Sequence, residues 1–299
     1  MKLYFILNRN TDGIIGVNNN LFASIPDDLK WFKRHTKNNI VMMGYNTWCS
    51  LKKTPLSDRI NIILTKNNYE YTRHLATYAI EKDIRFIYAS SAATYGNGEM
   101  GYCDDESKLH TLKPLNLYGH SKHDLDLWAE DQGILNRIVG LKYFNIFGPN
   151  EYHKGSMESM VRKGFLQARE KNKICLFKSY NGKYNDGDQE RDFLYIKDAV
   201  KMTLFFLDHP DINGIFNIGS GQARNWNDLA QNIFKAIGRE PTIEYIPMPE
   251  AIISQYQYHT CAEIKKIRSF GYTQTIMSLE ESVLDYIENY LVPNRRLAS

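Results

Sequence analysis

Ser90 and Ser91 are the first residues in the chain whose position suggests chemistry. They close the apolar run 86–89, which has the composition of a buried β-strand. Ligands of open α/β sheets bind where parallel strands end at their carboxyl edge. A serine hydroxyl at that place could form a hydrogen bond with a reacting oxygen atom of a substrate.

Tyr118 and Lys122 form a Tyr-x-x-x-Lys pair, a spacing that places both side chains on one face of a helix. An ammonium group near a phenol stabilises the phenolate, so Tyr118 is a candidate acid–base group and Lys122 its activator. The same spacing also arises by chance in a chain with 20 tyrosines, where it marks an ordinary surface helix. The upstream serine pair favours the functional interpretation.

A third segment contains Asn145 and Lys154. Asn145 closes a predicted strand, and the turn residues Gly148 and Pro149 follow it. Lys154 precedes a predicted helix, at a position where a cation has little structural use. Lys154 is therefore either a solvated loop lysine or a second acid–base group.

The elements that must position these residues alternate along the chain. The predicted strands are 2–7, 40–43, 60–64, 85–89, 138–144, 174–177, 215–218 and 243–246. The predicted helices are 27–35, 71–82, 121–131, 156–170, 196–207, 226–237, 262–270 and 278–290. Such alternation predicts an α/β fold of three layers with a mainly parallel sheet, followed after Lys154 by a smaller lobe of mixed structure that binds the substrate.

The composition narrows the class of protein. A net charge of +3 gives no argument for nucleic acid or a membrane surface as partner. The first apolar run is too short for a signal segment, and no stretch approaches the roughly 20 apolar residues of a membrane span, which predicts a cytoplasmic protein. No metal site or disulfide framework is expected, because no Cys-x-x-Cys pair occurs among Cys49, Cys103, Cys175 and Cys261.

Several longer motifs give the chain a family resemblance. They are Ala-Ser-Ser-Ala-Ala-Thr-Tyr-Gly at 89–96, His-Lys-Gly-Ser-Met at 153–157, Arg-Asp-Phe-Leu-Tyr-Ile-Lys-Asp at 191–198, and the segments 214–221, 243–249 and 255–257. From about residue 67 to about residue 290, the chain resembles the extended short-chain dehydrogenase/reductase family. Within that family it is most similar to the ADP-glycero-manno-heptose 6-epimerases, which invert one carbon of a bacterial lipopolysaccharide precursor.

The resemblance implies roles for individual residues. Ser91 would bond the sugar oxygen that is oxidised, Tyr118 would be one acid–base group, and Lys122 would activate it and contact the cofactor ribose. Lys154 would be the second acid–base group, on the opposite face of the sugar. The nucleotide-sugar would be bound by Asn145, Ser156, Arg191 and Tyr256, with the arginine suited to a diphosphate. The implied reaction is hydride transfer to NADP, rotation of the keto sugar, and hydride return.

The Gly-rich turn that binds the dinucleotide in this family is not found at the start of the chain. The one Gly-x-Gly-x-x-Gly pattern, Gly96 to Gly101, precedes Asp104 and Asp105 rather than an amphipathic helix. Without a strand–turn–helix context the pattern has no dinucleotide meaning, so we interpret it as part of a substrate loop. Binding of NADP would then depend on residues 1–66.

Residues 1–66 resemble a different family, dihydrofolate reductase. The motifs are at 12–17, 25–33, 42–48 and 59–65, although Phe22-Ala23 and Tyr45 replace a tryptophan and an arginine usual in that family. The resemblance implies that Asp28 binds the pterin and that Arg59 holds the folate glutamate. On local grounds alone, the preferred interpretation of Asp28 is structural, because a carboxylate in the first turn of a helix favours the helix dipole.

The two resemblances together predict a hybrid chain. It has a dihydrofolate reductase-like fragment at 1–66, which lacks the later half of that enzyme, and an epimerase-like region at 67–299. The N-terminal strands would complete the sheet of the epimerase. Three functions are compatible with this: an NADP-dependent nucleotide-sugar epimerase, an inactive hybrid that at most binds a nucleotide-sugar, and a dihydrofolate reductase. The expected partner is a small-molecule nucleotide-sugar, and a homo-oligomer is compatible with the resemblance.

Overall fold

The computed structural model describes residues 16–17, 20–21, 34, 40–44, 60–64 and 69–296 with the exception of 254. The chain divides into two compact units, Met1–Tyr71 and Thr72–Ser299, and each is described by itself. The predicted strand 2–7 lies outside the described residues. So does the predicted helix 27–35, apart from Arg34, which is helical.

The first unit contains two described strand pairs. Strand β1 (Gly16–Val17) pairs antiparallel with β2 (Asn20–Leu21). Strand β3 (Ile40–Gly44) pairs in parallel with β4 (Ile60–Leu64), which confirms the two strands predicted in this part of the chain.

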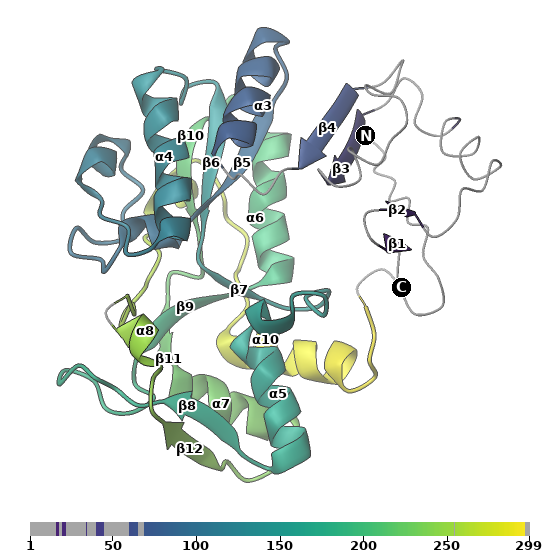
Figure 1. The fold of residues 1–299 in the computed structure, drawn as a ribbon, viewed down its shortest axis with the longest axis vertical. Coiled ribbons are helices and arrows are strands. Elements are labelled where there is room, and N and C mark those ends of the chain that lie inside the picture. Colours follow the sequence, from purple (N-terminus) through teal and green to yellow (C-terminus); the bar gives the residue numbers. More distant parts are fainter. Residues whose placement is uncertain are drawn as a thin grey trace. The chain divides into compact units, whose positions relative to one another are not determined.

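The second unit is built on a parallel sheet in the order β10–β6–β5 (Figure 1). The strands are β5 (Phe86–Ser91), β6 (Ile138–Tyr143) and β10 (Gly214–Ile218). Helix α3 (Glu70–Glu81) leads into β5, α4 (Leu117–Asp131) connects β5 to β6, and α6 (Ile196–Asp208) precedes β10. The α/β class and the mainly parallel sheet are confirmed.

Alternation along the strands gives the two faces of this sheet different chemistry. Val139 and Leu141 of β6 pack with Met202 and other apolar residues of α6 in one core cluster. The next residue, Lys142, faces α4, where it forms an ion pair with Asp126. The α4 side of the sheet therefore carries buried polar groups directly below the strand ends where a site is expected.

The remaining strands form a smaller lobe. Strands β7 (Asn145–Phe147), β9 (Glu190–Tyr195) and β11 (Ala223–Asn225) make one sheet, and β8 (Ile174–Phe177) pairs with β12 (Ile243–Ile246). Helices α5 (Met160–Lys171), α7 (Trp226–Ala236) and α10 (Leu279–Tyr286) enclose a second apolar core with them. The short helix α8 (Glu250–Ile253) also belongs to this part of the chain, and a π-helical turn (Ile287–Leu291) continues α10. Helix α9 (Lys265–Ser269) instead packs on the central sheet, where Ile267 joins the apolar core of β6 and β10.

Several predicted boundaries were wrong. Helix α4 begins four residues before the predicted 121, because the Asn116 side chain caps it by accepting a hydrogen bond from Gly119 N at 2.8 Å. The predicted helix 156–170 is a 3-10 turn (Gly155–Met157) followed by α5, which Ser159 caps. The predicted strand 138–144 ends at Tyr143, since Phe144 N turns to bond Ile218 O at 3.0 Å.

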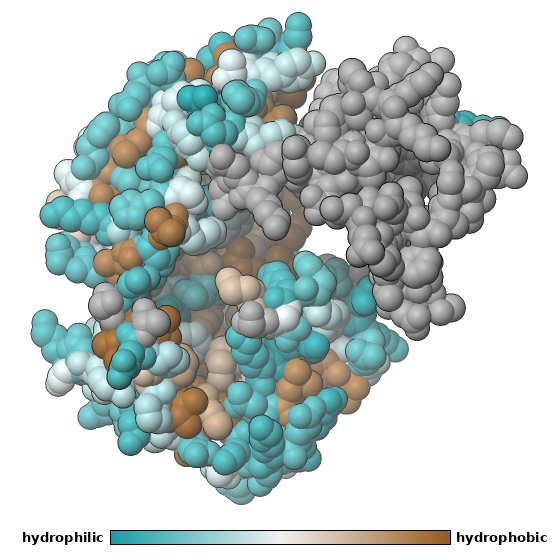
Figure 2. Space-filling model, in the orientation of Figure 1, coloured by the Kyte–Doolittle hydropathy of each residue, from teal (hydrophilic) through white to brown (hydrophobic). Residues whose placement is uncertain are grey.

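Strands β7, β9 and β11 and the short helix α8 were not predicted. Hydrophilic side chains surround smaller apolar areas on the face of the protein shown in Figure 2. In the described part of the chain, every helix is too short or too polar to cross a membrane.

Candidate functional site

Ser91 is the last residue of β5, at the carboxyl edge of the central sheet. Its hydroxyl oxygen caps the following 3-10 turn (Ala92–Tyr95) by accepting a hydrogen bond from Ala93 N at 3.2 Å. The side chain is oriented by this cap, and its own proton stays available for donation to a ligand oxygen.

Tyr118 and Lys122 lie one turn apart in α4, as the spacing predicted. Lys122 Nζ donates a hydrogen bond to Ala89 O at 2.8 Å, two residues before Ser91. Burial lowers the pKa of Lys122, whereas the nearby Asp126 carboxylate raises it. The Tyr118 side chain is 52% exposed and has no hydrogen bond within the described part of the chain. The structure therefore ties Lys122 to the serine strand and leaves the phenol of Tyr118 open to a ligand.

The start of α4 is held close to the turn that follows Ser91. A Cβ atom added to Gly119 would lie 2.8 Å from Ala93 O, so only glycine permits this approach. The contact brings the helix that carries Tyr118 against the strand end that carries Ser91. These three predicted residues, Ser91, Tyr118 and Lys122, thus belong to one local arrangement.

Arg191 and Tyr256 form a second group in the smaller lobe. Arg191 lies in β9 and is 7% exposed, with its guanidinium over the ring of Tyr256 at 4.9 Å and over that of Trp226 at 5.6 Å. Trp226 Nε1 donates to the Tyr256 hydroxyl at 3.0 Å and fixes the two rings. Burial lowers the pKa of Arg191, and neighbouring tyrosines raise it.

This arginine has no carboxylate partner among the described residues. Its guanidinium donates a hydrogen bond to Glu190 O at 2.7 Å. A buried cation is costly unless an anion or a set of acceptors compensates it, so Arg191 is suited to an anionic ligand. Asp192, the next residue, points to other partners and accepts four hydrogen bonds from Ser220, Gly221 and Ala262.

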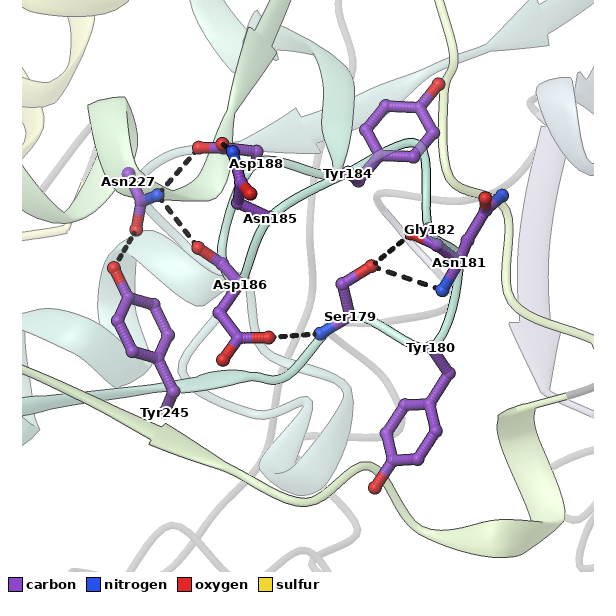
Figure 3. Close-up of a pocket in the computed structure, with 10 residues that line it drawn as sticks. All are labelled: Ser179, Tyr180, Asn181, Gly182, Tyr184, Asn185, Asp186, Asp188, Asn227 and Tyr245. Atoms are coloured by element: carbon purple, nitrogen blue, oxygen red, sulfur yellow. Dashed lines mark hydrogen bonds between the residues drawn. The ribbon is translucent and has the colours of Figure 1, made fainter.

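A polar cavity of about 670 Å³ lies in the same lobe (Figure 3). It is lined by the segment that connects β8 to β9, together with Asn227 of α7 and Tyr245 of β12. Asn227 organises it: its amide donates to Asp188 Oδ1 at 2.9 Å and to Asp186 O at 3.1 Å, and it accepts from the Tyr245 hydroxyl at 3.0 Å. Tyr184, another lining residue, packs on Tyr258 at 5.5 Å.

The cavity and Arg191 are joined by aromatic rings, since Tyr258 also contacts Tyr256 at 5.2 Å. No residue that lines this cavity was predicted from the sequence to belong to a site. The stretch 181–188, which is rich in Asn, Gly and Asp, is the sequence pattern that indicates a polar loop at this place.

The segment around Tyr256 also contacts the loop after Ser91. Gln257 Nε2 donates to Gly96 O, and the Tyr102 hydroxyl donates to His259 O. Tyr102 in turn packs edge-on against Tyr95 at 5.5 Å. These contacts connect the loop that follows Ser91 with the segment that carries Tyr256.

The Gly96–Gly101 loop takes part in these contacts and is not a dinucleotide turn. All three glycines of the pattern have positive φ, and Gly96 has a φ of +63°. A Cβ on Gly96 would lie 1.9 Å from Lys113 O. The chain continues from Gly101 to a 3-10 turn (Glu106–Thr111) rather than to an α-helix, in agreement with the sequence interpretation.

Lys154 occupies the N-cap position of the 3-10 turn Gly155–Met157, without a capping hydrogen bond from its side chain. It is exposed, and its ammonium has no hydrogen bond or ion pair with any described residue. Asn145 is the first residue of β7 and exposed, so it begins a strand rather than ending one. Ser156 lies in the turn after Lys154, and its side chain is outside what the structure describes. Asp28 and Arg59 also lie outside the described residues.

Comparison with known proteins identifies two families along the chain. Residues 51–219 match the NAD dependent epimerase/dehydratase family, and residues 2–97 match dihydrofolate reductase. The two matches overlap, so the boundary predicted at residues 66 and 67 stays a prediction. The second match does not end at residue 66, and the loss of the later half of a dihydrofolate reductase stays a prediction too.

Individual relatives are similar to the larger part of the chain. ADP-L-glycero-D-manno-heptose-6-epimerase of Nitratidesulfovibrio vulgaris (strain DP4) is 47% identical over 228 residues, which are 76% of this chain and 71% of the relative. The enzyme of the same name from Fusobacterium nucleatum is 46% identical over 237 residues, with the same two coverages.

Solved structures show the same likeness. The ADP-L-glycero-D-manno-heptose-6-epimerase of Helicobacter pylori superposes with a TM-score of 0.63 at 27% identity, over 89% of this chain and 76% of that one. The dTDP-glucose 4,6-dehydratase of Bacillus anthracis, in complex with NAD, shares the fold with a TM-score of 0.62 at 14% identity, over 85% and 96% of the two chains. The chain belongs to the NAD dependent epimerase/dehydratase family.

Proposed function

We propose that this member of the epimerase/dehydratase family is a nucleotide-sugar epimerase of the ADP-glycero-manno-heptose 6-epimerase type, with NADP as its cofactor. The observation that carries the proposal is the joint placement of Ser91, Tyr118 and Lys122 at the end of β5. Relatives that carry this enzyme name are 46–47% identical to the chain over most of its length.

The first chemical step rests on the residues around the serine. Ser91 donates its hydroxyl proton to the sugar oxygen and orients it, while Tyr118 removes the proton of the sugar hydroxyl. Lys122, held near the strand end by Ala89 O at 2.8 Å, supplies the positive charge that favours the phenolate. A bound NADP would supply the hydride acceptor for oxidation of the sugar carbon and, after rotation of the keto sugar, the hydride donor for its re-reduction.

Inversion needs a second acid–base group on the opposite face of the sugar, and we assign it to Lys154. Its ammonium is exposed and unpaired among the described residues, so it is free to engage a ligand. Asn145 and Ser156 belong to the same stretch of chain, and we propose that they bind the sugar alongside it.

Only the nicotinamide half of the cofactor has a fitting place among the described residues. Tyr118 and Lys122 border the strand edge where a nicotinamide ribose would lie. The pyrophosphate half finds no Gly-rich strand–helix turn in the described part of the chain, because Gly96–Gly101 serves the loop packing instead. That residues 1–66 bind this half stays a prediction from the sequence, which cofactor titration tests.

The substrate's diphosphate is assigned to Arg191, whose buried guanidinium lacks an anion. Rings of Tyr256, Tyr258 and Tyr184 lead from it to the polar cavity, which has the size and hydrogen-bonding groups for a nucleoside. This continuity supports a nucleotide-sugar as the small-molecule partner.

Direct titration with NADP⁺ and NADPH, by calorimetry or tryptophan fluorescence, tests the cofactor. Micromolar binding followed by turnover of ADP-heptose is the expected result. Tyr118→Phe should reduce turnover by at least about 100-fold, because the ionisable hydroxyl is lost with little change in volume, and its melting temperature should stay unchanged. No binding at millimolar cofactor would leave a hybrid that only binds a nucleotide-sugar.

A second candidate is dihydrofolate reductase activity, which the match of residues 2–97 to that family favours. The assay is oxidation of NADPH with dihydrofolate, together with a methotrexate titration. Tight methotrexate binding and inhibition of this oxidation would support the second candidate, with Asp28 and Arg59 as its pterin and glutamate contacts.

A further inference from the structure

Asp126 and Lys142 form an ion pair that is almost completely inaccessible to solvent. Their side chains are 0% and 1% exposed, and Lys142 Nζ lies 2.6 Å from Asp126 Oδ2. The pair joins α4 to β6, the middle strand of the described central sheet. Neither residue takes part in the chemistry proposed for Ser91, Tyr118 and Lys122.

The hydrogen-bond donors around the Asp126 carboxylate come from the strands that α4 covers. The Tyr88 hydroxyl donates to Oδ1 at 2.9 Å, and the Ser90 hydroxyl donates to Oδ2 at 2.7 Å. With Lys142, three donors from two strands converge on one helical side chain. Such a fully bonded buried carboxylate fixes both the position and the rotation of the helix.

Lys142 extends the network to the turn after Ser91. Its ammonium also donates to Thr94 Oγ1 at 2.6 Å and lies over the Tyr95 ring at 5.0 Å. Thr94 in turn donates to Ser91 O at 2.8 Å. One connected set of hydrogen bonds therefore runs from the middle of α4 to the backbone of Ser91.

The spacing along α4 connects the pair to the proposed chemistry. Tyr118, Lys122 and Asp126 are separated by four residues each and share one face of the helix. Asp126 is hydrogen-bonded to β5 and β6, and Lys122 is hydrogen-bonded to β5, whereas the phenol of Tyr118 at the helix start has no hydrogen bond with any described residue. The placement of Tyr118 relative to Ser91 is thus set by the two anchors behind it.

We propose that Asp126 and Lys142 are positioning residues, which hold α4 at the distance and rotation from β5 that place Tyr118 opposite Ser91. The inference rests on the proposed epimerase function, whose acid–base step uses these two hydroxyl groups. A shift of about 1 Å between reacting groups can reduce a rate about 100-fold, so a device of this kind has a large effect on turnover.

The test uses the full chain and two variants. Asp126→Asn combined with Lys142→Met removes both charges together, which avoids leaving one buried charge unpaired. Asp126→Glu keeps the pair but adds one methylene where the side chain is 0% exposed, so it must displace α4 from the sheet. Each variant is measured by steady-state kinetics with NADP and ADP-heptose, and by hydrogen–deuterium exchange of residues 117–131.

We expect kcat to fall about tenfold or more in both variants while KM changes less than about twofold, because substrate binding rests on the separate Arg191 group. Exchange of the α4 amides should accelerate about tenfold relative to those of α6. The matched control is Lys197→Met with Asp285→Asn, which removes an ion pair of 2.7 Å between α6 and α10 and should leave kcat unchanged.

Normal kcat and unchanged α4 exchange in a folded variant would overturn the proposal. If the double variant does not fold, Asp126→Glu decides the question, because a folded Asp126→Glu protein with wild-type kcat contradicts the positioning role. The exchange measurement needs neither cofactor nor substrate. A wild-type chain without epimerase activity would therefore refute the proposed function while α4 exchange still tests whether the pair holds the helix.

Discussion

Replacement of Arg191 by methionine should weaken the binding of an anionic ligand without lowering the stability of the fold. Arg191 is 7% exposed, its guanidinium contacts the rings of Tyr256 and Trp226, and it has no carboxylate partner among the described residues. Its charge is therefore a cost to the free protein that an anionic ligand would offset. Methionine fills much of the same volume without the charge.

The magnitude follows from these contacts. A charge-assisted hydrogen bond contributes about 1.5–3 kcal/mol, and loss of a bidentate contact to phosphate should cost about 3 kcal/mol, or roughly 100-fold in Kd. On the folding side, loss of two cation–π contacts costs about 1–2 kcal/mol. Relief from burying an uncompensated cation offsets this, so Arg191→Met should keep or raise the melting temperature.

The assay pairs calorimetric titration with ADP and thermal unfolding of the free protein. Arg224→Met is the matched control, since Arg224 in the same lobe has two carboxylate partners, Asp228 at 2.9 Å and Glu280 at 2.6 Å. The control should melt at a lower temperature and bind ADP as the wild type does. Wild-type affinity for ADP in Arg191→Met would refute the assignment of Arg191 to the diphosphate.

Two further perturbations have predictable outcomes. Gly96→Ala should lower the free energy of unfolding in urea by about 2 kcal/mol or more, because φ is +63° and the new Cβ would lie 1.9 Å from Lys113 O. The hydrogen bond from Arg224 lowers the pKa of Glu280 from 4.5 to about 2, so its stabilisation is complete above pH 4.5 and is lost as the pH falls through about 2. The difference in melting temperature between wild type and Glu280→Gln should therefore be constant near neutral pH and shrink below pH 4.5. A difference that grows on acidification would contradict the assigned direction.

The strands with continuous apolar runs could be predicted because their signals are local. Strands β8 and β12 of the smaller lobe have the predicted bounds, and β5 and β6 of the central sheet and helix α6 differ from the predicted bounds by one or two residues. An apolar run that is covered on both faces needs no knowledge of its partners to be identified. The Tyr118–Lys122 pair likewise follows from helical spacing alone.

Strand β9 was not predicted from the sequence, because its charged residues are more typical of a loop than of a buried strand. Arg191 and Asp192 interrupt the apolar pattern, yet both are buried, and their partners lie far along the chain, at Trp226, Tyr256 and Ser220. Only the tertiary structure supplies the aromatic rings and backbone donors that make such burial favourable. The same holds for the direction of Lys122, whose hydrogen bond to Ala89 O depends on how α4 packs.

Different elements of the fold position the two groups of the candidate site. An incomplete cofactor site would therefore affect hydride transfer and substrate binding differently. Ser91 and Lys122 belong to the central sheet and α4, whereas Arg191 and Tyr256 are held by β9, α7 and the smaller apolar core. They meet through the contacts of Tyr102 and Gln257, which involve no residue of the first unit. Nucleotide-sugar binding should therefore persist even where hydride transfer is lost. Tight binding of ADP without binding of NADP would show that the substrate group is complete and that the chain lacks a working cofactor site.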